Sequence, residues 1–550
     1  MKNKLLTSSI KAGFEKIDWK LLIFLLLFLN FKLIIKIAAL VLIYALRPGF
    51  KFGFKITNSR LPLFYIIIPA IGLLNWLLYG MVGNLNYTLI LITGISFWVS
   101  CILAIHQVKL SIENNRPEVL HQTILFFFII NAIISLSVYA GIVWETGAIN
   151  PYRYQGNYQK YFIGTGDYIK GLTFDTSTTN AVINGLGLIY FLFRGKKIPA
   201  LMCMTVLLLT GSNFTNLLLC GALLYMFIFQ TKKDQKSIIV VCFAMLITFL
   251  VKVSPQNNNY VTAACEKIFN IQKPVAKKAK KDIPLTEKPD SILTLAEKRQ
   301  KFAQLYLDSI NISLSKKVKV KPVMANMLIT DVMARPVIPG DSIHTPSFQH
   351  RNDTSQAEKK LIQFIESNAG KLRISSRMLS SKKLPGKMVA LQQTYHFFKQ
   401  HPFILLTGTG IANFSSKLAF RATSMNVSGN YPARFAYIND DFKTNHLDLF
   451  LFYFTDKDDY HSVMNSPNST YDQLLSEYGL AGLISFAVFY IAFFAKQIKK
   501  KSVAIPLLLF MLGAFFIEYW FEQLSVVVFF ELLILLNIKE TTGTINNAAT

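Results

Sequence analysis

The sequence has few cysteines and few acidic residues, and both shortages limit what the protein can be. Its five cysteines show no paired spacing, and four of them fall inside apolar runs. Neither a disulfide framework nor a CxxC-type zinc site is expected, and we predict no metal and no cofactor. Only 31 Asp and Glu residues stand against 58 Lys and Arg, which gives a formal net charge of +27. No basic domain stands apart from the apolar segments, so nucleic acid is not an expected partner.

Hydrophobic residues are abundant, making up 52% of the 550-residue chain, and 13% of the chain is aromatic. This proportion is typical of a protein with many lipid-facing helices. We therefore predict an all-α integral membrane protein with about 12 transmembrane helices that contacts membrane lipid. The basic segment 1–20 is followed by no small-residue cleavage site, so the first apolar run is expected to remain as an anchor.

The first apolar region, 21–46, is interrupted by Lys32 and Lys36 and has two interpretations. Its length favours one helix, because about 20 apolar residues cross a bilayer. Charge favours two helices, because the basic residues before and after it should both face the cytoplasm, which requires an even number of crossings. We predict a hairpin of two spans. The further predicted spans are 63–81, 87–105, 123–143, 181–193, 199–210, 214–229, 238–251, 474–495, 503–519 and 524–536.

Charge on the short connectors sets the predicted orientation of these spans. Connectors expected inside are rich in Lys and Arg, whereas those expected outside carry almost no charge. The chain then divides into a bundle of about nine spans at 1–251 with an outward loop at 144–180, a large outward loop at 252–473, and the last three spans with a cytoplasmic C-terminal tail at 474–550. The lysine-rich insertion at 273–321 begins with low-complexity sequence typical of a flexible tether.

Two polar motifs lie near the end of the large loop. The first comprises Gly386, Lys387, His401, Pro402, Gly408, Gly410 and Phe414. The second, Asn-x-x-Tyr-x(3)-Leu-x-Glu-x-Gly-x-x-Gly, runs from Asn468 to Gly482 and leads into a predicted span. Together with weaker echoes at 169–181 and 208–215, these motifs resemble the O-antigen ligase and polymerase family. The resemblance covers most of the chain outside roughly 273–380.

The resemblance implies a metal-independent glycosyltransferase of the bacterial inner membrane. Such enzymes transfer a glycan from undecaprenyl pyrophosphate to an acceptor on the periplasmic side, so the large loop would be periplasmic. Our first interpretation is a polymerase that joins lipid-linked repeat units into O-antigen or capsular or exopolysaccharide. A ligase that transfers the glycan to lipid A core is the alternative. A transporter of lipid-linked oligosaccharide is an alternative of another class, but the single polar loop and the lack of internal repeats favour an enzyme.

The chain departs from the family at positions that bear on the chemistry. Lysine replaces the usual arginine at Lys387 and Lys170. In the segment 208–215, Asn213 follows a serine at a position where the family has arginine. Pro467 stands where a histidine commonly precedes the asparagine of the second motif. The positive charge is therefore kept at two positions, whereas the histidine is absent.

Displacement of pyrophosphate from an anomeric carbon needs positive charge around the leaving phosphates. The candidate pyrophosphate-binding residues are Lys387, Arg421, Lys170 and Arg434. The alternative for each is a solvated loop cation. Arg421 is expected on a helix, because Phe414, Leu418 and Arg421 recur at helical spacing.

The attacking sugar hydroxyl calls for a general base. The candidates are His461 first and then His446, with Glu477 and Asp175 as carboxylate alternatives. Gly408 and Gly410 are interpreted as a turn rather than a phosphate cradle. Glu531 lies deep in the last span, where an ionised carboxylate facing lipid is costly, so it is expected to face protein.

Overall fold

The computed structural model describes residues 17–56, 58–153, 166–254, 385–423, 431–449, 463, 466–499 and 502–546. Within these ranges the chain is helical and contains no β-strand, which confirms the predicted all-α class. The lysine-rich insertion at 273–321 and His461 lie outside them. Four described helical stretches are long and apolar enough to cross a membrane: α5 (Leu85–Asn114), α6 (Pro117–Thr146), α10 (Lys233–Thr248) with a π-helical turn to Val253, and α19 (Thr470–Phe486) with its continuation through α20 (Ala492–Ala495).

Each predicted apolar segment contains a helix, although the bounds differ. The shorter apolar helices are α2 (Trp19–Phe28), α3 (Leu33–Leu46), α4 (Phe64–Leu78), α7 (Ser177–Phe193), α8 (Lys197–Leu209), α9 (Asn213–Phe229) and α21 (Ala504–Ala514). The last helix, α23 (Ser525–Asn546), continues well beyond its predicted end at 536. The remaining described α-helices are α15 (Gly386–Gln400), α16 (Lys417–Ala422), α17 (Asp440–Asn445) and α22 (Trp520–Gln523).

Region 21–46 forms two helices rather than one, which confirms the two-helix part of the predicted hairpin. α2 begins after Asp18, whose carboxylate accepts the Leu21 N–H as an N-cap, and α2 packs against α3. Lys36 is buried between them, yet its ammonium donates to the Phe28 carbonyl (2.8 Å) and to the Ser525 hydroxyl (2.9 Å). The carbonyl belongs to the C-terminal end of α2, where backbone acceptors are unpaired and the helix dipole favours a cation. The lysine that interrupts the apolar run is therefore satisfied inside the fold.

The core is organised around α23, which packs against α5, α7 and α21. This helix is buried on all sides from Ser525 to Leu536, because its residues there are almost all apolar around the whole circumference. Glu531 is the one ionisable residue of this stretch, and its carboxylate accepts a hydrogen bond from the Tyr65 hydroxyl of α4. The expectation that Glu531 faces protein is confirmed.

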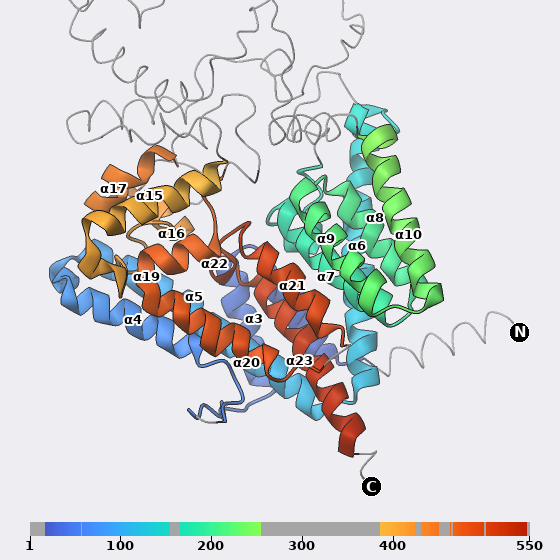
Figure 1. Cartoon of the computed structure of the whole chain (residues 1–550), viewed down its shortest axis with the longest axis horizontal. Helices are drawn as coiled ribbons and strands as arrows, with labels where there is room; N and C mark the ends of the chain where they lie inside the picture. Colours follow the sequence, from blue (N-terminus) through green and yellow to red (C-terminus); the bar gives the residue numbers. More distant parts are fainter. Residues whose placement is uncertain are drawn as a thin grey trace, which may run out of the picture.

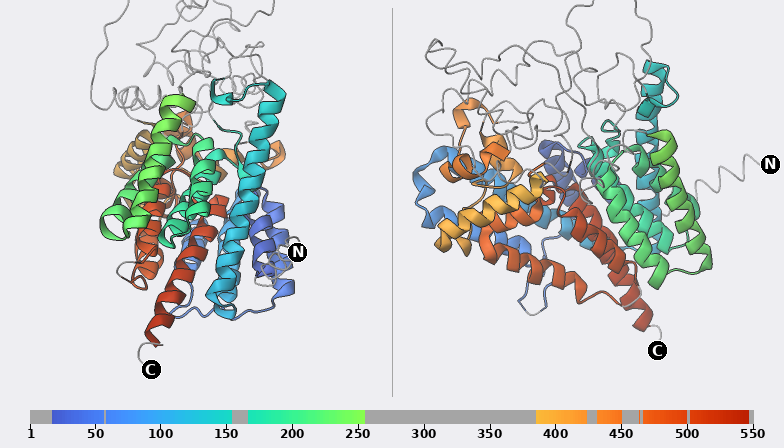
Figure 2. Two further views of the ribbon diagram at one scale, coloured as in Figure 1. Left: turned by 90° about the vertical axis from the view of Figure 1, so that its right-hand side faces the viewer. Right: turned by 45° about the horizontal axis from the view of Figure 1, so that its top comes forward.

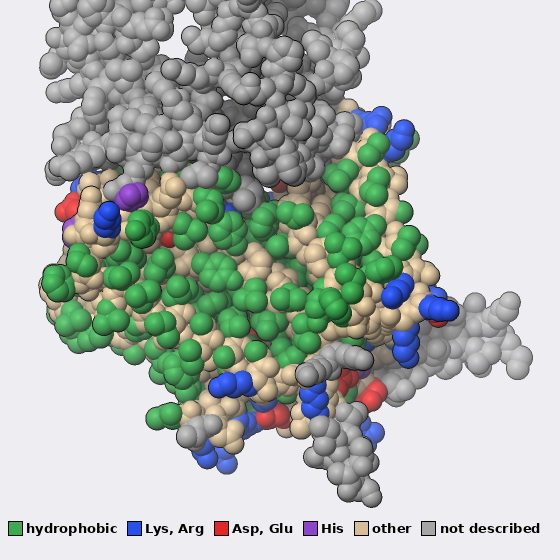
Figure 3. All heavy atoms as spheres, in the orientation of Figure 1, with side chains coloured by type: hydrophobic (Ala, Val, Ile, Leu, Met, Phe, Trp, Pro, Cys, Tyr) green, Lys and Arg blue, Asp and Glu red, His purple; other side chains and the backbone are tan. Residues whose placement is uncertain are grey.

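The helices form two groups on either side of this core. Figures 1 and 2 show α6 to α10 as one group, and α4, α5, α15, α16, α17 and α19 as the other, with α3, α21 and α23 between them. In Figure 3, apolar side chains cover the middle of the visible face, and Lys and Arg gather at its lower end. This distribution is compatible with a protein that sits in a membrane.

Candidate functional site

The first polar motif begins with a lysine that is turned into the protein. Lys387 lies in the first turn of α15 and is fully buried. Its ammonium donates to the Ser466 hydroxyl (3.0 Å), the Ile517 carbonyl (2.7 Å) and the Asn468 carbonyl. Burial lowers the pKa of Lys387 to about 7, although the carboxylates of Glu518 and Asp472 act in the opposite direction. The three oxygens match the three N–H groups of an ammonium, so Lys387 fastens α15 to the segments that lead into α19 and out of α21.

The glycines of the two motifs pack directly against each other. Gly408 and Gly479 both have positive φ, at +77° and +66°, and Gly479 breaks the helical geometry inside α19. The break frees backbone groups that bond to the turn after α15: the Thr409 N–H donates to the Ser476 carbonyl (3.0 Å), and the Ala481 N–H to the Leu406 carbonyl (3.0 Å). The Gly408–Gly410 pair therefore forms a turn, as predicted.

Glu477 holds the same turn through its side chain. Its carboxylate accepts the N–H groups of Ala412 (2.9 Å) and Phe414 (3.3 Å), and the carboxylate is fully buried. Because these N–H groups point to Glu477, the helix that follows starts only at Lys417. The expectation that Phe414 belongs to the helix of Arg421 was therefore wrong. Glu477, a candidate catalytic residue, occupies the interior of the motif rather than its surface.

The turn also packs against the apolar helices α4 and α5. Ile411 fits against Gly72 of α4 and Gly94 of α5, where an added Cβ would lie only 2.5 Å and 2.3 Å from its side chain. Asn75 donates to the Thr407 carbonyl (2.7 Å), and the Tyr79 hydroxyl donates to the Gly408 carbonyl (2.8 Å). The motifs thus form a rigid block fixed to α4 and α5.

This close packing predicts the effect of one methyl group. In Gly408→Ala the new Cβ would lie 2.4 Å from the backbone carbon of Glu477, at a φ that alanine rarely adopts. We expect a loss of more than about 2 kcal/mol of stability, seen as less protein in the membrane and a lower melting temperature in detergent. Gly83→Ala is the matched control, because nothing lies within 4 Å of its Cβ position. Equal accumulation of the two variants would contradict this packing.

His446 lies in the interior behind this block. The Gln393 amide nitrogen donates to Asp448 Oδ1 (2.9 Å). This contact orients the Gln393 side chain so that its amide oxygen faces His446 Nδ1 (2.8 Å). Nδ1 must therefore carry the proton, and Nε2 faces the Ser415 hydroxyl (3.1 Å). Burial lowers the pKa of His446 to about 3, so the imidazole is neutral at physiological pH. The ring also stacks on Phe414, and none of its surface is exposed.

A cluster of charged and polar side chains lies at the junction of α16, α22 and the start of α7. Glu522 of α22 accepts the Leu418 N–H (3.1 Å) and the Gln473 amide (2.6 Å). Burial raises the pKa of Glu522 to about 7, opposed by the positive charges of Arg421 and Lys417. Both cations are partly exposed and lie one helical turn apart on the same face of α16. They present two positive charges at a partly exposed position.

Gln523 extends the cluster to the start of α7. In the amide orientation that suits both neighbours, its oxygen accepts from Lys417 Nζ (3.1 Å) and its nitrogen donates to Asp175 Oδ2 (3.3 Å). Asp175 also accepts from the Thr179 hydroxyl (3.0 Å) and is partly exposed. We call Asp175, Lys417, Arg421, Glu522 and Gln523 the junction cluster. It unites three segments that are far apart in the sequence.

Buried amides fix the segment that carries Asp175. Asn131 of α6 donates to the Asn180 side chain (2.9 Å) and accepts the Leu172 N–H (2.9 Å). Asn180 in turn donates to the Ile169 carbonyl (2.9 Å). The Phe31 N–H donates to the Thr173 carbonyl (2.9 Å), which ties the segment to the α2–α3 hairpin. The segment that carries Asp175 is therefore held both by α6 and α7 and by the α2–α3 hairpin.

The predicted site residues do not all converge. Arg421 belongs to the junction cluster, as does the carboxylate alternative Asp175. Lys170 is exposed, and Arg434 is exposed with its guanidinium 4.5 Å from the Phe435 ring centroid. A surface hollow of about 550 Å³, lined by Met81, Asn84, Asn86 and residues 436–441, contains none of the predicted site residues.

Sequence reasoning missed three members of the junction cluster. Lys417 could have been found, because it follows the N-cap residue Ser416 and precedes Arg421 by four residues. Glu522 and Gln523 gave no local signal, since they lie between two apolar segments and meet α16 only in the fold.

No protein-family model, curated protein or solved structure matches this chain.

Proposed function

We propose that the protein is a glycosyltransferase of the bacterial inner membrane that polymerises undecaprenyl-pyrophosphate-linked oligosaccharide repeat units. The observation that carries the proposal is the pair of partly exposed cations, Lys417 and Arg421, in one cluster with the carboxylate of Asp175, which Gln523 links to Lys417. Glycosyl transfer from a pyrophosphate requires cations for the leaving group and a proton acceptor within the same site. The motif resemblance supplies the substrate class.

In the proposed reaction, an acceptor sugar hydroxyl attacks the anomeric carbon of the donor glycan. A new C–O bond forms while the bond from that carbon to the pyrophosphate oxygen breaks, and the electron pair leaves with the pyrophosphate. Arg421 offers a bidentate guanidinium and Lys417 a point charge to the leaving phosphates. Lys387 has all three N–H groups directed at protein oxygens, so in this proposal it positions the motifs instead of binding substrate.

The hydroxyl proton passes to a general base, for which His461 remains the first candidate. His446 is less suited, because both its ring nitrogens face protein groups and burial, which lowers its pKa to about 3, makes it a weak proton acceptor. His461→Gln is expected to slow transfer by roughly two to four orders of magnitude, measured as product formed per enzyme. Near-normal turnover of this variant would exclude His461 and move the role to Asp175, which Asp175→Asn tests directly.

The proposal includes about 12 spans, cytoplasmic termini and a periplasmic 252–473 loop. In a Cys265→Ser background, cysteine introduced at Thr345 is expected to react with an impermeant thiol reagent added to cells whose inner membrane is intact. Cysteine at Thr231, in the connector between α9 and α10, should react only after the inner membrane is opened. The reverse pattern would contradict this orientation.

The chain-length profile of surface glycan in a deletion strain tests the proposed activity. Loss of a polymerase leaves single repeat units attached to the normal acceptor, because ligation continues. Loss of a ligase leaves long chains on the lipid carrier and none on lipid A core. The first pattern supports the proposal, and the second would replace it with the ligase.

A further inference from the structure

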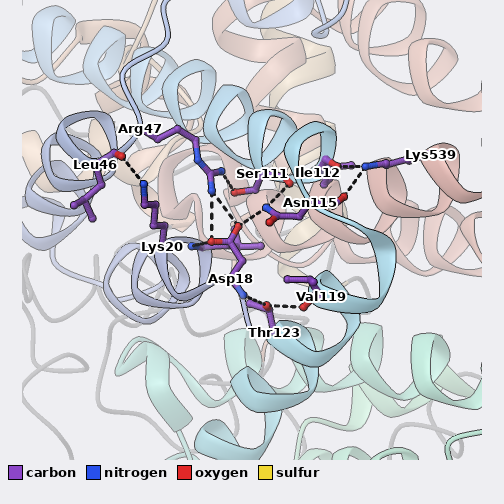
Figure 4. Close-up of polar contacts among 11 residues, drawn as sticks. Asp18, Lys20, Leu46, Arg47, Ser111, Ile112, Asn115, Val119, Thr123 and Lys539 are labelled. Atoms are coloured by element: carbon purple, nitrogen blue, oxygen red, sulfur yellow. Dashed lines mark hydrogen bonds and ion pairs between the residues drawn. The ribbon is translucent and has the colours of Figure 1, made fainter. Parts of the chain in front are cut away.

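Several cations at the predicted cytoplasmic end are engaged by the protein. Figure 4 shows Arg47 paired with Asp18 (3.1 Å), and Lys539 donating to the carbonyls of Ile112 (2.5 Å) and Asn115 (2.6 Å). Lys20 donates to the Leu46 carbonyl (2.8 Å) in the same region. Beyond the figure, Arg60 pairs with Glu113, Arg194 with Glu540, and Lys499 donates to the Thr541 carbonyl. These contacts hold helix ends together and give each of these cations an oxygen partner.

Five lysines at the same end differ from these. Lys196 and Lys197 start α8, and Lys232, Lys233 and Lys236 start α10; we call this set the lysine cluster. The two connectors lie side by side, because the Gln235 amide donates to the carbonyls of Leu192 (3.1 Å) and Phe193 (2.8 Å) at the end of α7. In Figure 3, Lys and Arg side chains gather at the level of the lower end of α10.

The lysine cluster has little internal compensation. Four of its members are exposed, and Asp234 is the acidic residue on these connectors. Within the described part of the chain, no carboxylate pairs with any of the five ammonium groups, and Lys236 instead lies 4.9 Å from the Phe227 ring centroid. The positive ends of the α8 and α10 dipoles add to this charge.

Apolar side chains emerge beside the lysine cluster. Ile198 is 82% exposed, and Ile228 and Phe229 are 63% and 61% exposed. A phospholipid carries apolar acyl chains directly beside a negatively charged phosphate. The exposed aliphatic and aromatic side chains suit the acyl chains, and the neighbouring unpaired ammonium groups suit the phosphate. A soluble anion would satisfy the charge but leave these side chains uncovered.

We infer that the lysine cluster is a docking surface for anionic phospholipid of the cytoplasmic leaflet. The lipid phosphate binds between the α7–α8 and α9–α10 connectors, and its acyl chains cover Ile198, Ile228 and Phe229. Binding there fixes the depth of the α6–α10 group in the bilayer. The inference is independent of the catalytic proposal and rests on the orientation that the connectors predict.

The test is lipid selectivity of the purified full-length protein. Spin-labelled phosphatidylglycerol and phosphatidylcholine are compared in a phosphatidylcholine background at 0.1 M NaCl. We expect wild-type protein to select phosphatidylglycerol more than tenfold, since each lysine near an anionic headgroup adds to the attraction. The variant Lys196→Gln/Lys197→Gln/Lys232→Gln/Lys233→Gln should lose most of this preference. At 1 M NaCl the wild-type preference should also fall, because the screening length shrinks to about 3 Å.

The control is Lys51→Gln/Lys55→Gln, which removes two exposed lysines from another connector at the same end. It should keep wild-type selectivity. An equal loss of selectivity in the control and the quadruple variant, or none in either, would overturn the inference. Displacement of the lipid by millimolar inorganic phosphate would also overturn it in favour of a soluble anion. If the quadruple variant does not fold, Lys196→Gln/Lys197→Gln and Lys232→Gln/Lys233→Gln serve separately, and each should show a partial loss.

Discussion

Replacing Arg421 with alanine is expected to abolish glycan product while leaving the amount of protein in the membrane unchanged. Arg421 is partly exposed, and its guanidinium makes no hydrogen bond to other described residues. Glu522, its charged neighbour, keeps its bonds to Leu418 and Gln473 in the variant. The loss should therefore fall on the transition state, where the leaving pyrophosphate gathers charge, and should exceed about a hundredfold in turnover.

Two further substitutions sharpen this prediction. Arg421→Lys should recover only part of the activity, because the charge returns without the bidentate geometry of the guanidinium. Lys417→Gln should also reduce turnover, since it removes the second cation of the pair. Full activity in Arg421→Ala, measured against membrane protein amount by immunoblot, would show that Arg421 is a solvated surface charge.

Replacing Lys387 with alanine is expected to have the opposite result, with loss of the protein itself. The substitution leaves the buried carbonyls of Asn468 and Ile517 and the Ser466 hydroxyl without their donor. Each buried acceptor left unpaired costs about 1–3 kcal/mol, so we expect the three together to cost at least about 3 kcal/mol. We expect low membrane levels and a sharply lower melting temperature. Arginine should not rescue the variant, because its planar fork does not fit three converging oxygens.

Lys399→Ala is the matched control, since Lys399 lies in the last turn of the same helix and is exposed. It should accumulate as wild type does. Normal accumulation of Lys387→Ala together with lost turnover would contradict the positioning role and return Lys387 to the pyrophosphate site. Arg421 and Lys387, equivalent as candidates in the sequence, are thus separated by burial.

The helices themselves could be read from the sequence, because apolar runs bounded by polar residues are local features. Even the α2–α3 hairpin followed from the placement of charge. The limits lay in long-range contacts. Nothing local indicates that Gly408 packs against the break at Gly479, or that Glu477 takes the N–H groups that would otherwise extend the helix of Arg421 back to Phe414.

For the candidate site too, single residues could be predicted from the sequence, but their burial and long-range contacts could not. Arg421 stood out as a basic residue in a polar segment, but the sequence could not tell an exposed cation from a buried one such as Lys387. Charged residues between apolar runs, such as Glu522, became informative only once α22 lay beside α16. The junction cluster is a product of the fold, assembled from residues near 175, 420 and 522.

The most direct test of the account is a reconstituted reaction. Purified full-length protein in liposomes is supplied with undecaprenyl-pyrophosphate-linked repeat units, and both glycan length and released undecaprenyl pyrophosphate are measured. We predict a ladder of lengthened lipid-linked glycan with one undecaprenyl pyrophosphate released per new glycosidic bond, and neither product with Arg421→Ala. Movement of the lipid-linked unit across the bilayer without a new bond or released pyrophosphate would contradict the account and identify a transporter.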